Sequence, residues 1–304
     1  MAQAGQPPAS GLEIAAWKQW SATVCAFALA VIFLGAGIWK LSDPLATSAR
    51  MAQALIPSQL ALATALLTGI AEAFAGVLLV VPRWRRWGAW LSGLMLVAFM
   101  IYIGVHYNAL LGEDCSCFPW LKRAVGVEFF ISDALMLLAA IVAGLWARPS
   151  ESLKQALAVL AAVSVFAGAV YGMTKARQTG IEAPAQIAVD GKPFNLHHGR
   201  VFLYFFDPEC SHCDAAARHL QKHHWVGVRI VAVATANPQW GPQFLSATGL
   251  KAGLSDDALR LRGVFKFTDP PYGVALDNGR QQAAFTFFDK TEPEEGLRRL
   301  GWIE

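Results

Sequence analysis

Long apolar runs separated by short polar segments fill roughly the first 175 residues of the chain. Each run is close to the ~20 residues that a helix needs to cross the hydrocarbon core of a bilayer. Tryptophans stand near the ends of the runs, as expected at a membrane–water interface. The pattern predicts five transmembrane helices, over residues 21–41, 59–81, 87–111, 125–146 and 153–173.

Basic residues between these helices predict their orientation. Arg83, Arg85 and Arg86 lie between the second and third helices, and Arg148 and Lys154 lie between the fourth and fifth. Because lysine and arginine concentrate in cytoplasmic loops, both loops and the N-terminus are expected in the cytoplasm. The loop between the third and fourth helices, and everything after the fifth, then face outside, although two basic residues in the former argue mildly against this. The pattern indicates a multi-pass protein of a bacterial inner membrane with a periplasmic C-terminal part.

After residue 182 the pattern changes to short strands and helices. Residues 200–206 form the continuous apolar run of a buried strand, and residues 226–234 form a second, β-branched one. Two further strands, at 272–276 and 282–288, flank Asp277-Asn278-Gly279, a strong hairpin signal. Helices are expected over residues 214–222, 243–248, 256–261 and 292–300. The order predicts an α/β domain around one sheet.

These patterns divide the chain into four parts. Residues 1–16 are expected to be disordered. Residues 17–148 should form a four-helix membrane domain, and residues 149–182 the fifth helix and a linker. Residues 183–304 should form the α/β domain. The fold class is therefore an all-α transmembrane bundle of four helices, with a fifth tethering helix, followed by an α/β domain.

The composition agrees with a membrane protein, and it limits the kinds of function that the chain can have. Hydrophobic residues make up 55% of the chain and charged residues 15%, below the ~25% usual for soluble domains. A net charge of +3 is too small to indicate nucleic-acid binding. Four of the five cysteines form two close pairs. Such pairs close almost no loop, so they suit redox exchange or metal binding better than structural bonding. The fifth, Cys25, is expected to be a packed free thiol.

The pair Cys210 and Cys213 follows the first buried strand and opens a helix. The positive end of a helix favours a thiolate, so we expect a lowered pKa for Cys210 and a role as nucleophile. Cys213 lies one turn later and can resolve a mixed disulfide. His212, between them, would stabilise the thiolate further when protonated.

The alternative for this pair is half of a zinc site, because C-x-x-C is also a zinc-ligand spacing. The soluble part has no second cysteine pair to complete four ligands, so no metal site is predicted. Four other histidines of this part are expected to be solvated surface residues: His197, His198, His223 and His224.

The order of strand, C-x-x-C, helix and a later proline ahead of a hairpin resembles the thioredoxin superfamily, over residues 183–304. The resemblance implies a thioredoxin-like fold with a cis-proline that packs against the active-site pair and helps to bind the substrate chain. Pro271 is a better match for that proline than Pro270, because it stands directly before the strand at 272–276.

The second pair, Cys115 and Cys117, is expected at the outer edge of the membrane bundle. Two cysteines one residue apart can form only a small, strained ring, and strain makes a disulfide easier to reduce. Such a pair suits a relay better than a structural bond. The alternatives are two inert thiols or a weak metal site.

Four short motifs, at residues 37–44, 72–79, 115–118 and 130–135, occur in an order that resembles the DoxX-like superfamily, and especially its methylamine-utilisation MauE branch. The resemblance covers about residues 18–148. It implies a DoxX-like four-helix core and a role in redox maturation of an extracytoplasmic partner enzyme, through disulfide handling.

Ionisable residues inside the apolar helices are costly and therefore functional candidates. At ~1.5 Å per residue, His106 and Glu128 should lie near the outer face, within reach of Cys115 and Cys117. Either is a candidate proton acceptor during thiol exchange, with interhelical hydrogen bonding as the alternative. Three others have expected structural roles: Glu72 and Asp133 inside the bundle, and Lys40 extending to the interface.

These predictions describe a membrane-bound thiol–disulfide oxidoreductase that relays electrons between the two cysteine pairs and acts on periplasmic protein thiols and disulfides. A quinone is the one cofactor suggested, by analogy with other four-helix disulfide-forming membrane proteins. One alternative is a non-catalytic accessory or assembly factor for a periplasmic dehydrogenase of the methylamine-utilisation type. Another is a metal carrier.

Overall fold

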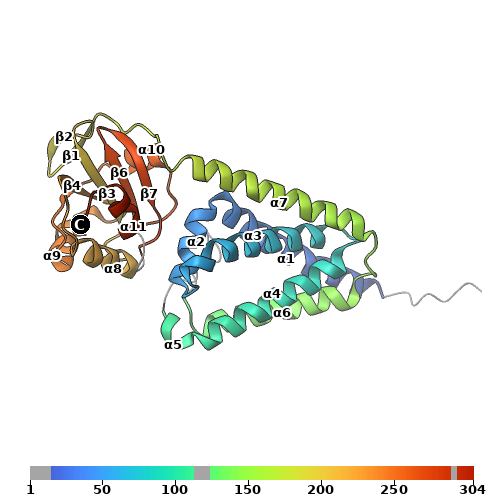
Figure 1. Cartoon of the computed structure of the whole chain (residues 1–304). Coiled ribbons are helices and arrows are strands. Elements are labelled where there is room, and N and C mark those ends of the chain that lie inside the picture. The colour runs from blue at the N-terminus through green and yellow to red at the C-terminus, as the bar shows by residue number, and fades with distance from the viewer. Residues whose placement is uncertain (1–14, 113–123, 289–292) are drawn as a thin grey trace, which may run out of the picture. The chain divides into compact units, whose positions relative to one another are not determined.

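The computed structural model describes residues 15–112, 124–288 and 293–304 (Figure 1). The described chain forms two compact units. One contains the residues up to Trp39 together with Leu67–Phe166, and the other contains Lys40–Leu66 together with Ala167–Glu304. The predicted disorder of residues 1–16 falls almost entirely outside the described residues.

Within the described residues, five helices are long and apolar enough to cross a membrane: α1 (Ala16–Ser42), α3 (Ser58–Val80), α4 (Arg85–Val105), α6 (Val127–Trp146) and α7 (Leu153–Ala176). They correspond to the five predicted helices, and the chain is a multi-pass membrane protein. The prediction that the third helix continues to Leu111 was wrong. The helix ends at Val105, and a separate turn of helix, α5 (Tyr107–Leu110), follows His106.

Small side chains line the contacts within the first unit. Its core joins alanines of α1, α3, α4 and α6 with a few larger residues such as Leu29, Leu79 and Leu96. In lipid, small residues let helix backbones approach closely, and this contact replaces the hydrophobic effect that water would supply. Larger apolar side chains, including Leu94 and Leu135, point outward, as expected of surfaces that face lipid.

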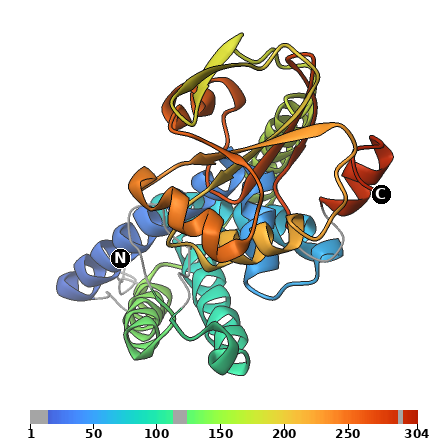
Figure 2. The same ribbon diagram turned by 90° about the vertical axis from the view of Figure 1, so that its left-hand side faces the viewer.

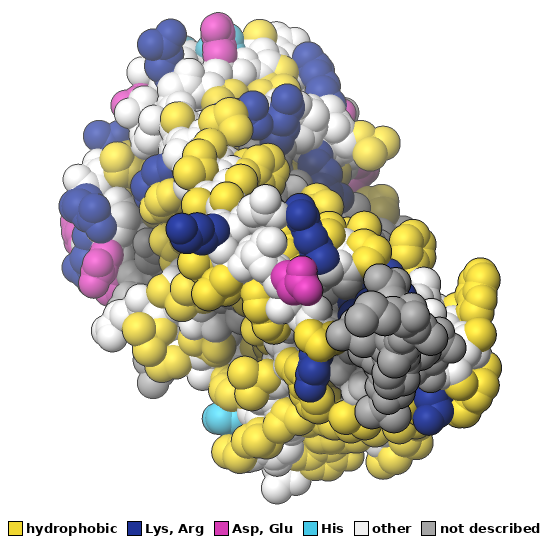
Figure 3. Space-filling model, turned by 90° about the vertical axis from the view of Figure 1, so that its right-hand side faces the viewer, with side chains coloured by type: hydrophobic (Ala, Val, Ile, Leu, Met, Phe, Trp, Pro, Cys, Tyr) yellow, Lys and Arg dark blue, Asp and Glu magenta, His cyan; other side chains and the backbone are white. Residues whose placement is uncertain are grey.

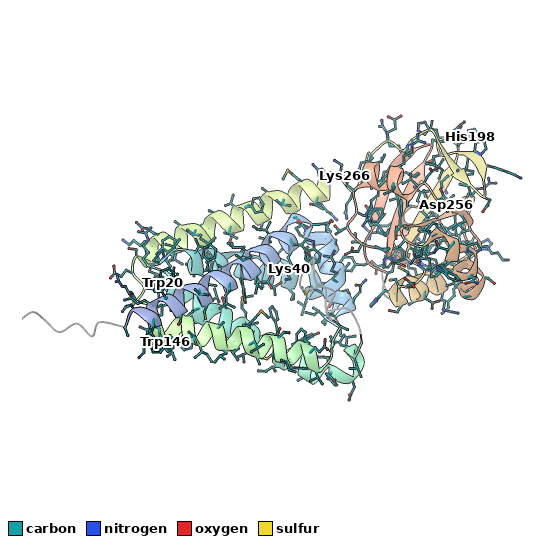
Figure 4. All side chains as sticks on the ribbon, turned by 180° about the vertical axis from the view of Figure 1, so that it is seen from behind. Trp20, Lys40, Trp146, His198, Asp256 and Lys266 are labelled. Carbon is teal, nitrogen blue, oxygen red and sulfur yellow. The ribbon has the colours of Figure 1, made fainter. Side chains whose placement is uncertain are left out.

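The basic loops lie together at one end of this unit. The backbone N–H of Glu151 donates to the carbonyl of Arg83, and Nη1 of Arg85 donates to Thr23 of α1 at 2.9 Å. Trp17 and Trp146 meet edge to face with ring centroids 5.3 Å apart. Figure 3 looks at this end and shows Lys and Arg side chains among hydrophobic ones. Figure 4 shows Trp20 and Trp146 together there. The two loops predicted to share one side of the membrane therefore lie at one end of the bundle.

The helix α2 (Pro44–Gln53) was not predicted. Its N-cap is Asp43, whose carboxylate accepts from the backbone N–H of Ala46 at 3.1 Å. An aspartate cap followed by proline at the first helical position is a strong start signal. The sequence therefore contained the signal for this helix, although its ten residues are too few to be a membrane span.

The soluble domain of the second unit is a five-stranded sheet in the order β5-β4-β3-β6-β7. The strands are β3 (Arg200–Phe206), β4 (Val228–Ala234), β5 (Gly253–Ser255), β6 (Tyr272–Asp277) and β7 (Arg280–Phe285). β3, β4 and β5 are parallel, and β6 and β7 are antiparallel to their neighbours. A separate hairpin of β1 (Gln186–Val189) and β2 (Lys192–Asn195) precedes them.

The alternation of side chains along β3 builds the two cores of this domain. Successive residues of a strand point to opposite faces. Phe202, Tyr204 and Phe206 pack in one core with α8 (Ser211–Leu220), α9 (Gly241–Thr248) and α11 (Glu294–Arg299). Val201, Leu203 and Phe205 pack in the other with α10 (Ala258–Phe265). Helices therefore cover both faces of the sheet (Figures 1 and 2), as the sequence predicts for an α/β domain.

Candidate redox-active site

Cys210 stands where the central strand passes into a helix. β3 ends at Phe206, and Cys210 is the N-cap of α8. Its Sγ accepts a hydrogen bond from the backbone N–H of Cys213 at 3.2 Å. The first N–H groups of a helix have no partner within the helix, and a cap side chain satisfies one of them. The helix terminus thus holds the sulfur of Cys210 in place and favours its negative charge.

The pKa of Cys210 is lowered to about 5. The largest cause is a hydrogen bond from the Cys213 thiol. A hydrogen bond from His212, the Cys213 backbone N–H and the charge of His212 act in the same direction, against the opposing effect of burial. The lowered pKa that the sequence suggested is thus present. With this pKa, Cys210 is a thiolate at neutral pH, and its side chain is partly exposed.

Cys213 has the opposite environment. Its side chain is fully buried, and its Sγ accepts from the backbone N–H of Asp207 at 3.5 Å. Burial first, and then the neighbouring Cys210 sulfur, raise the pKa of Cys213. Both thiols are free. The pair therefore consists of one partly exposed thiolate and one buried thiol.

Tyr204 also contributes to the surroundings of the cysteine pair, although it was not predicted as a site residue. Its hydroxyl donates to the carbonyl oxygen of Cys213 at 2.7 Å, and the ring is fully buried. Burial, followed by the charges of Cys213 and Cys210, holds the pKa of Tyr204 well above its usual value, so the hydroxyl stays a donor. Its hydroxyl group, on the side of an otherwise apolar strand that faces α8, is the sequence feature that could have indicated this role.

Pro271 follows a cis peptide bond, Pro270–Pro271. The prediction that Pro271 is the cis-proline is confirmed. Tyr272, the first residue of β6, pairs with Phe205 of β3. Pro271 therefore enters the sheet at the same end from which the chain leaves β3 toward Cys210. Its contact with a substrate chain stays a prediction.

The membrane pair Cys115 and Cys117 lies outside the described residues. The flanking residues are described: the backbone N–H of Gly112 donates to the carbonyl of Val125 at 3.1 Å. Leu110, Val125 and neighbouring aromatic residues form a small core there. The two flanks of the cysteine loop therefore meet at the end of the bundle where α4 finishes and α6 begins.

The two candidate proton acceptors belong to this same end. Nδ1 of His106 lies 3.0 Å from the carbonyl oxygen of Tyr102, and the two rings are 4.5 Å apart. Glu128 is exposed in the first turn of α6. Their role toward Cys115 and Cys117 stays a prediction.

The predicted environments of four other residues in the membrane helices had different outcomes. Cys25 is a free thiol packed against the bundle core, and Glu72 and Asp133 are buried, as expected. Lys40, which was predicted to extend to the interface, is instead buried, with its side chain only 3% exposed. The long aliphatic stem of lysine can pack against apolar surface, so its length alone does not fix where the side chain lies.

The four histidines that were predicted to be solvated also differ in their exposure. His198 and His224 are exposed, and Figure 4 shows His198 at the surface of the soluble domain. The prediction of solvated side chains was wrong for His197 and His223, which are partly buried. Nε2 of His197 lies 2.7 Å from the carbonyl oxygen of Ala183, which explains its position.

Residues 18–147 match the family of methylamine utilisation protein MauE. This part of the chain is a MauE domain. The match agrees with the resemblance carried by the short sequence motifs, and it covers less than half of the 304 residues. The MauE domain is followed by a domain with the thioredoxin fold, which is defined here by its strand order, its C-x-x-C at the start of α8 and its cis-proline before β6.

Solved structures similar to the soluble domain include three from bacteria. A secreted Mycobacterium tuberculosis disulfide oxidoreductase homologous to E. coli DsbE is 22% identical, over 38% of this chain and 93% of that chain, with a TM-score of 0.31. A thioredoxin domain of a Bacteroides vulgatus thiol-disulfide oxidoreductase is 17% identical, over 35% and 86%, with a TM-score of 0.30. A mutant Xanthomonas campestris peroxiredoxin Q is 15% identical, over 41% and 97%, with a TM-score of 0.35. No curated protein matches the chain.

Proposed function

We propose that this protein is a membrane-bound thiol–disulfide oxidoreductase in which Cys210 and Cys213 exchange disulfides with proteins outside the cytoplasm. The observation that carries the proposal is the asymmetry of the pair. Cys210 caps a helix, is partly exposed and has a pKa of about 5, whereas Cys213 is a buried thiol behind it. A thiolate attacks and a protected thiol resolves.

The exchange follows from these positions. The Cys210 thiolate attacks one sulfur of a partner disulfide, forms a mixed disulfide and releases the other partner sulfur as a thiolate. Cys213 then gives up its proton and attacks the Cys210 sulfur, which forms the Cys210–Cys213 disulfide and releases the second partner sulfur. Two electrons pass to the partner, and its two thiols take the proton of Cys213 and one from water. The reverse sequence oxidises a partner.

We further propose that Cys115 and Cys117 exchange electrons with this pair by the same chemistry. The support is the MauE domain, and the position of the flanks of that loop at the bundle end away from the basic loops. The five candidate membrane helices of the described residues, an odd number, support a chain after α7 on the side opposite the N-terminus. Tethering would give the two pairs a high effective concentration. His106 and Glu128 are the candidate proton acceptors, and a quinone is the candidate electron acceptor of the bundle.

This proposal retains the predicted division of the chain. The MauE domain occupies residues 17–148, the fifth helix and linker residues 149–182, and the thioredoxin-like domain residues 183–304. The basic loops face the cytoplasm, and the thioredoxin-like domain faces the periplasm of a bacterial cell.

A disulfide-exchange assay tests the proposal. The purified full chain in detergent is reduced, freed of reductant and mixed with a self-quenched fluorescent peptide dimer joined by a disulfide. The wild-type chain and the control Cys25→Ser should cleave it at equal rates, because Cys25 is packed in the bundle. Cys210→Ser should lose at least ~100-fold, because its hydroxyl is not ionised at neutral pH. Exchange that persists in Cys210→Ser would remove the basis of the proposal.

The alternative of an assembly factor has one observation in its favour, the match of the membrane domain to a methylamine utilisation protein. In that case the soluble domain would guide the disulfides of one dehydrogenase subunit. A Cys213→Ala chain, which cannot resolve mixed disulfides, would then retain a single partner, whereas a general oxidoreductase would retain several.

A further inference from the structure

Two histidines and a glutamate gather at the end of α8 that is remote from the cysteines. His219 lies in the last turn of α8, His223 in the turn that follows it, and Glu294 in the first turn of α11. Because α8 has ten residues, at about 1.5 Å each, the group lies roughly 15 Å along the helix from Cys210. The thiol chemistry proposed above makes no use of it.

The possible ligand atoms of these three side chains are close together. Nε2 of His219 lies 3.7 Å from Oε2 of Glu294. The rings of His219 and His223 meet edge to face with centroids 4.8 Å apart, and one ligand atom from each residue lies within 4.8 Å of the others. Ligands about 2.1 Å from a tetrahedral zinc ion stand roughly 3.4 Å apart. Small side-chain rotations would therefore bring the three atoms to coordination distance.

The two histidine nitrogens are sheltered without a hydrogen-bond partner. Nε2 of His219 and Nε2 of His223 are both buried, and neither has such a partner within the described part of the chain. Polar atoms in this position are rare in native proteins because burial without a partner is costly. Burial first, and then the neighbouring His219, lower the pKa of His223. A neutral imidazole is the form of histidine that binds a metal ion.

Glu294 supplies a negative charge and is held by Arg298. Nη2 and Nε of Arg298 donate to Oε1 of Glu294 at 3.0 and 3.1 Å, so Oε2 is the oxygen that faces His219. The same hydrogen bond lowers the pKa of Glu294, which is therefore ionised at neutral pH. Arg298 adds an opposing positive charge nearby, but it also orients the carboxylate as outer-shell partners of metal ligands do.

We propose that His219, His223 and Glu294 bind a divalent transition-metal ion of the zinc type. Two imidazole nitrogens and one carboxylate oxygen, with a fourth position left for water, match a donor set that zinc takes in proteins. The ion would tie the end of α8 to α11, two helices that already share a core through Leu220 and Leu297. It would thereby anchor the helix whose other end carries Cys210.

Cobalt(II) titration of the purified full chain in detergent tests this site. The visible absorption of bound cobalt(II) reports nitrogen and oxygen ligands. An intense near-ultraviolet band would instead indicate binding to thiolates. The wild-type chain should bind one cobalt ion without the thiolate band, and zinc should displace it. His223→Gln and Glu294→Gln should each weaken binding at least ~100-fold, because even outer-shell changes cost 10–100-fold. The control His198→Gln alters an exposed histidine and should bind like the wild type.

The two ligand variants lie on different elements, so misfolding of one leaves the other informative. Zinc should also raise the unfolding temperature of the wild type and His198→Gln, but not that of either ligand variant, because only a folded site binds it. The proposal is overturned if the wild type binds no cobalt, binds it only with the thiolate band, or binds it no more tightly than His223→Gln and Glu294→Gln.

Discussion

The thiols of Cys210 and Cys213 lie one helical turn apart, but their surroundings push their pKa values in opposite directions. The folded pKa of Cys210, about 5, lies below the ordinary thiol value of 9.0. Its contribution to the stability of the reduced protein is complete above pH 9 and is lost as the pH falls through 5. The reduced form is thus favoured at neutral pH, which makes the pair more oxidising.

The first prediction concerns His212, whose hydrogen bond and charge lower the pKa of Cys210. The rate of iodoacetamide alkylation of Cys210, followed by peptide mass spectrometry between pH 3.5 and 8, should show a midpoint near 5 in the wild type. His212→Gln should raise that midpoint by roughly one pH unit, because it removes the imidazolium charge. His198→Gln serves as the control and should leave the midpoint unchanged. An identical midpoint in His212→Gln and the wild type would refute this role.

The residues of the redox site could be predicted where the signal is local. Cys210 and His212 are neighbours at a helix start, and Pro271 directly precedes a strand, so a short stretch of sequence identified each. His223 and Glu294 are 71 positions apart in the chain. They meet only because α11 packs on α8 through the core of the sheet. Contacts that depend on such tertiary packing leave no periodic or local trace in a single sequence.

At the scale of elements, the membrane helices α1 and α3 pack closely against each other at Gly37. A Cβ added there would stand 2.9 Å from the carbonyl oxygen of Gly69 and would also clash with the backbone of Ala73. These atoms belong to the backbone and cannot move aside. The close approach of the two helices therefore requires glycine at this position, as small residues do in other membrane interfaces.

The second prediction follows from this contact. Gly37→Ala should destabilise the bundle by about 1–3 kcal/mol, the usual cost of overpacking. The unfolding temperature of the purified chain in detergent measures the effect. The matched control is Gly168→Ala in α7, where an added Cβ meets nothing within 4 Å. That substitution should be neutral or slightly stabilising, because alanine is the better helix former. Equal unfolding temperatures for the two variants would contradict the close packing of α1 and α3.

Long elements were predictable and short ones were not. The apolar runs of the five membrane helices and of β3 are long enough for their periodicity to decide the assignment. β5 has three residues, and β1 and β2 have four each, so no period can be recognised in them. β5 exists because β4 offers it a parallel edge, which is a property of the sheet rather than of the segment itself.

At the scale of the whole molecule, the basic loops give the topology its physical basis. Arg83 and Glu151 share a backbone hydrogen bond at one end of the bundle, and Gly112 and Val125 share another where the cysteine loop begins and ends. The contacts group the loops as the sequence predicted, whereas the side of the membrane that each group faces follows only from charge. In the proposed orientation both cysteine pairs face one aqueous compartment, so that a disulfide can pass between them.

Capture of that transfer is the most direct test of the relay. The chain is made as Cys25→Ser, Cys213→Ala and Cys117→Ala, which leaves Cys115 and Cys210, and in a second form with Cys115→Ala in place of Cys117→Ala. Membranes of each are mildly oxidised and digested without reductant, and the disulfides are identified by mass spectrometry. We expect a disulfide within one chain from Cys210 to the remaining membrane cysteine in at least one form. Its absence from both, while Cys210 still forms disulfides with other proteins, would contradict the relay.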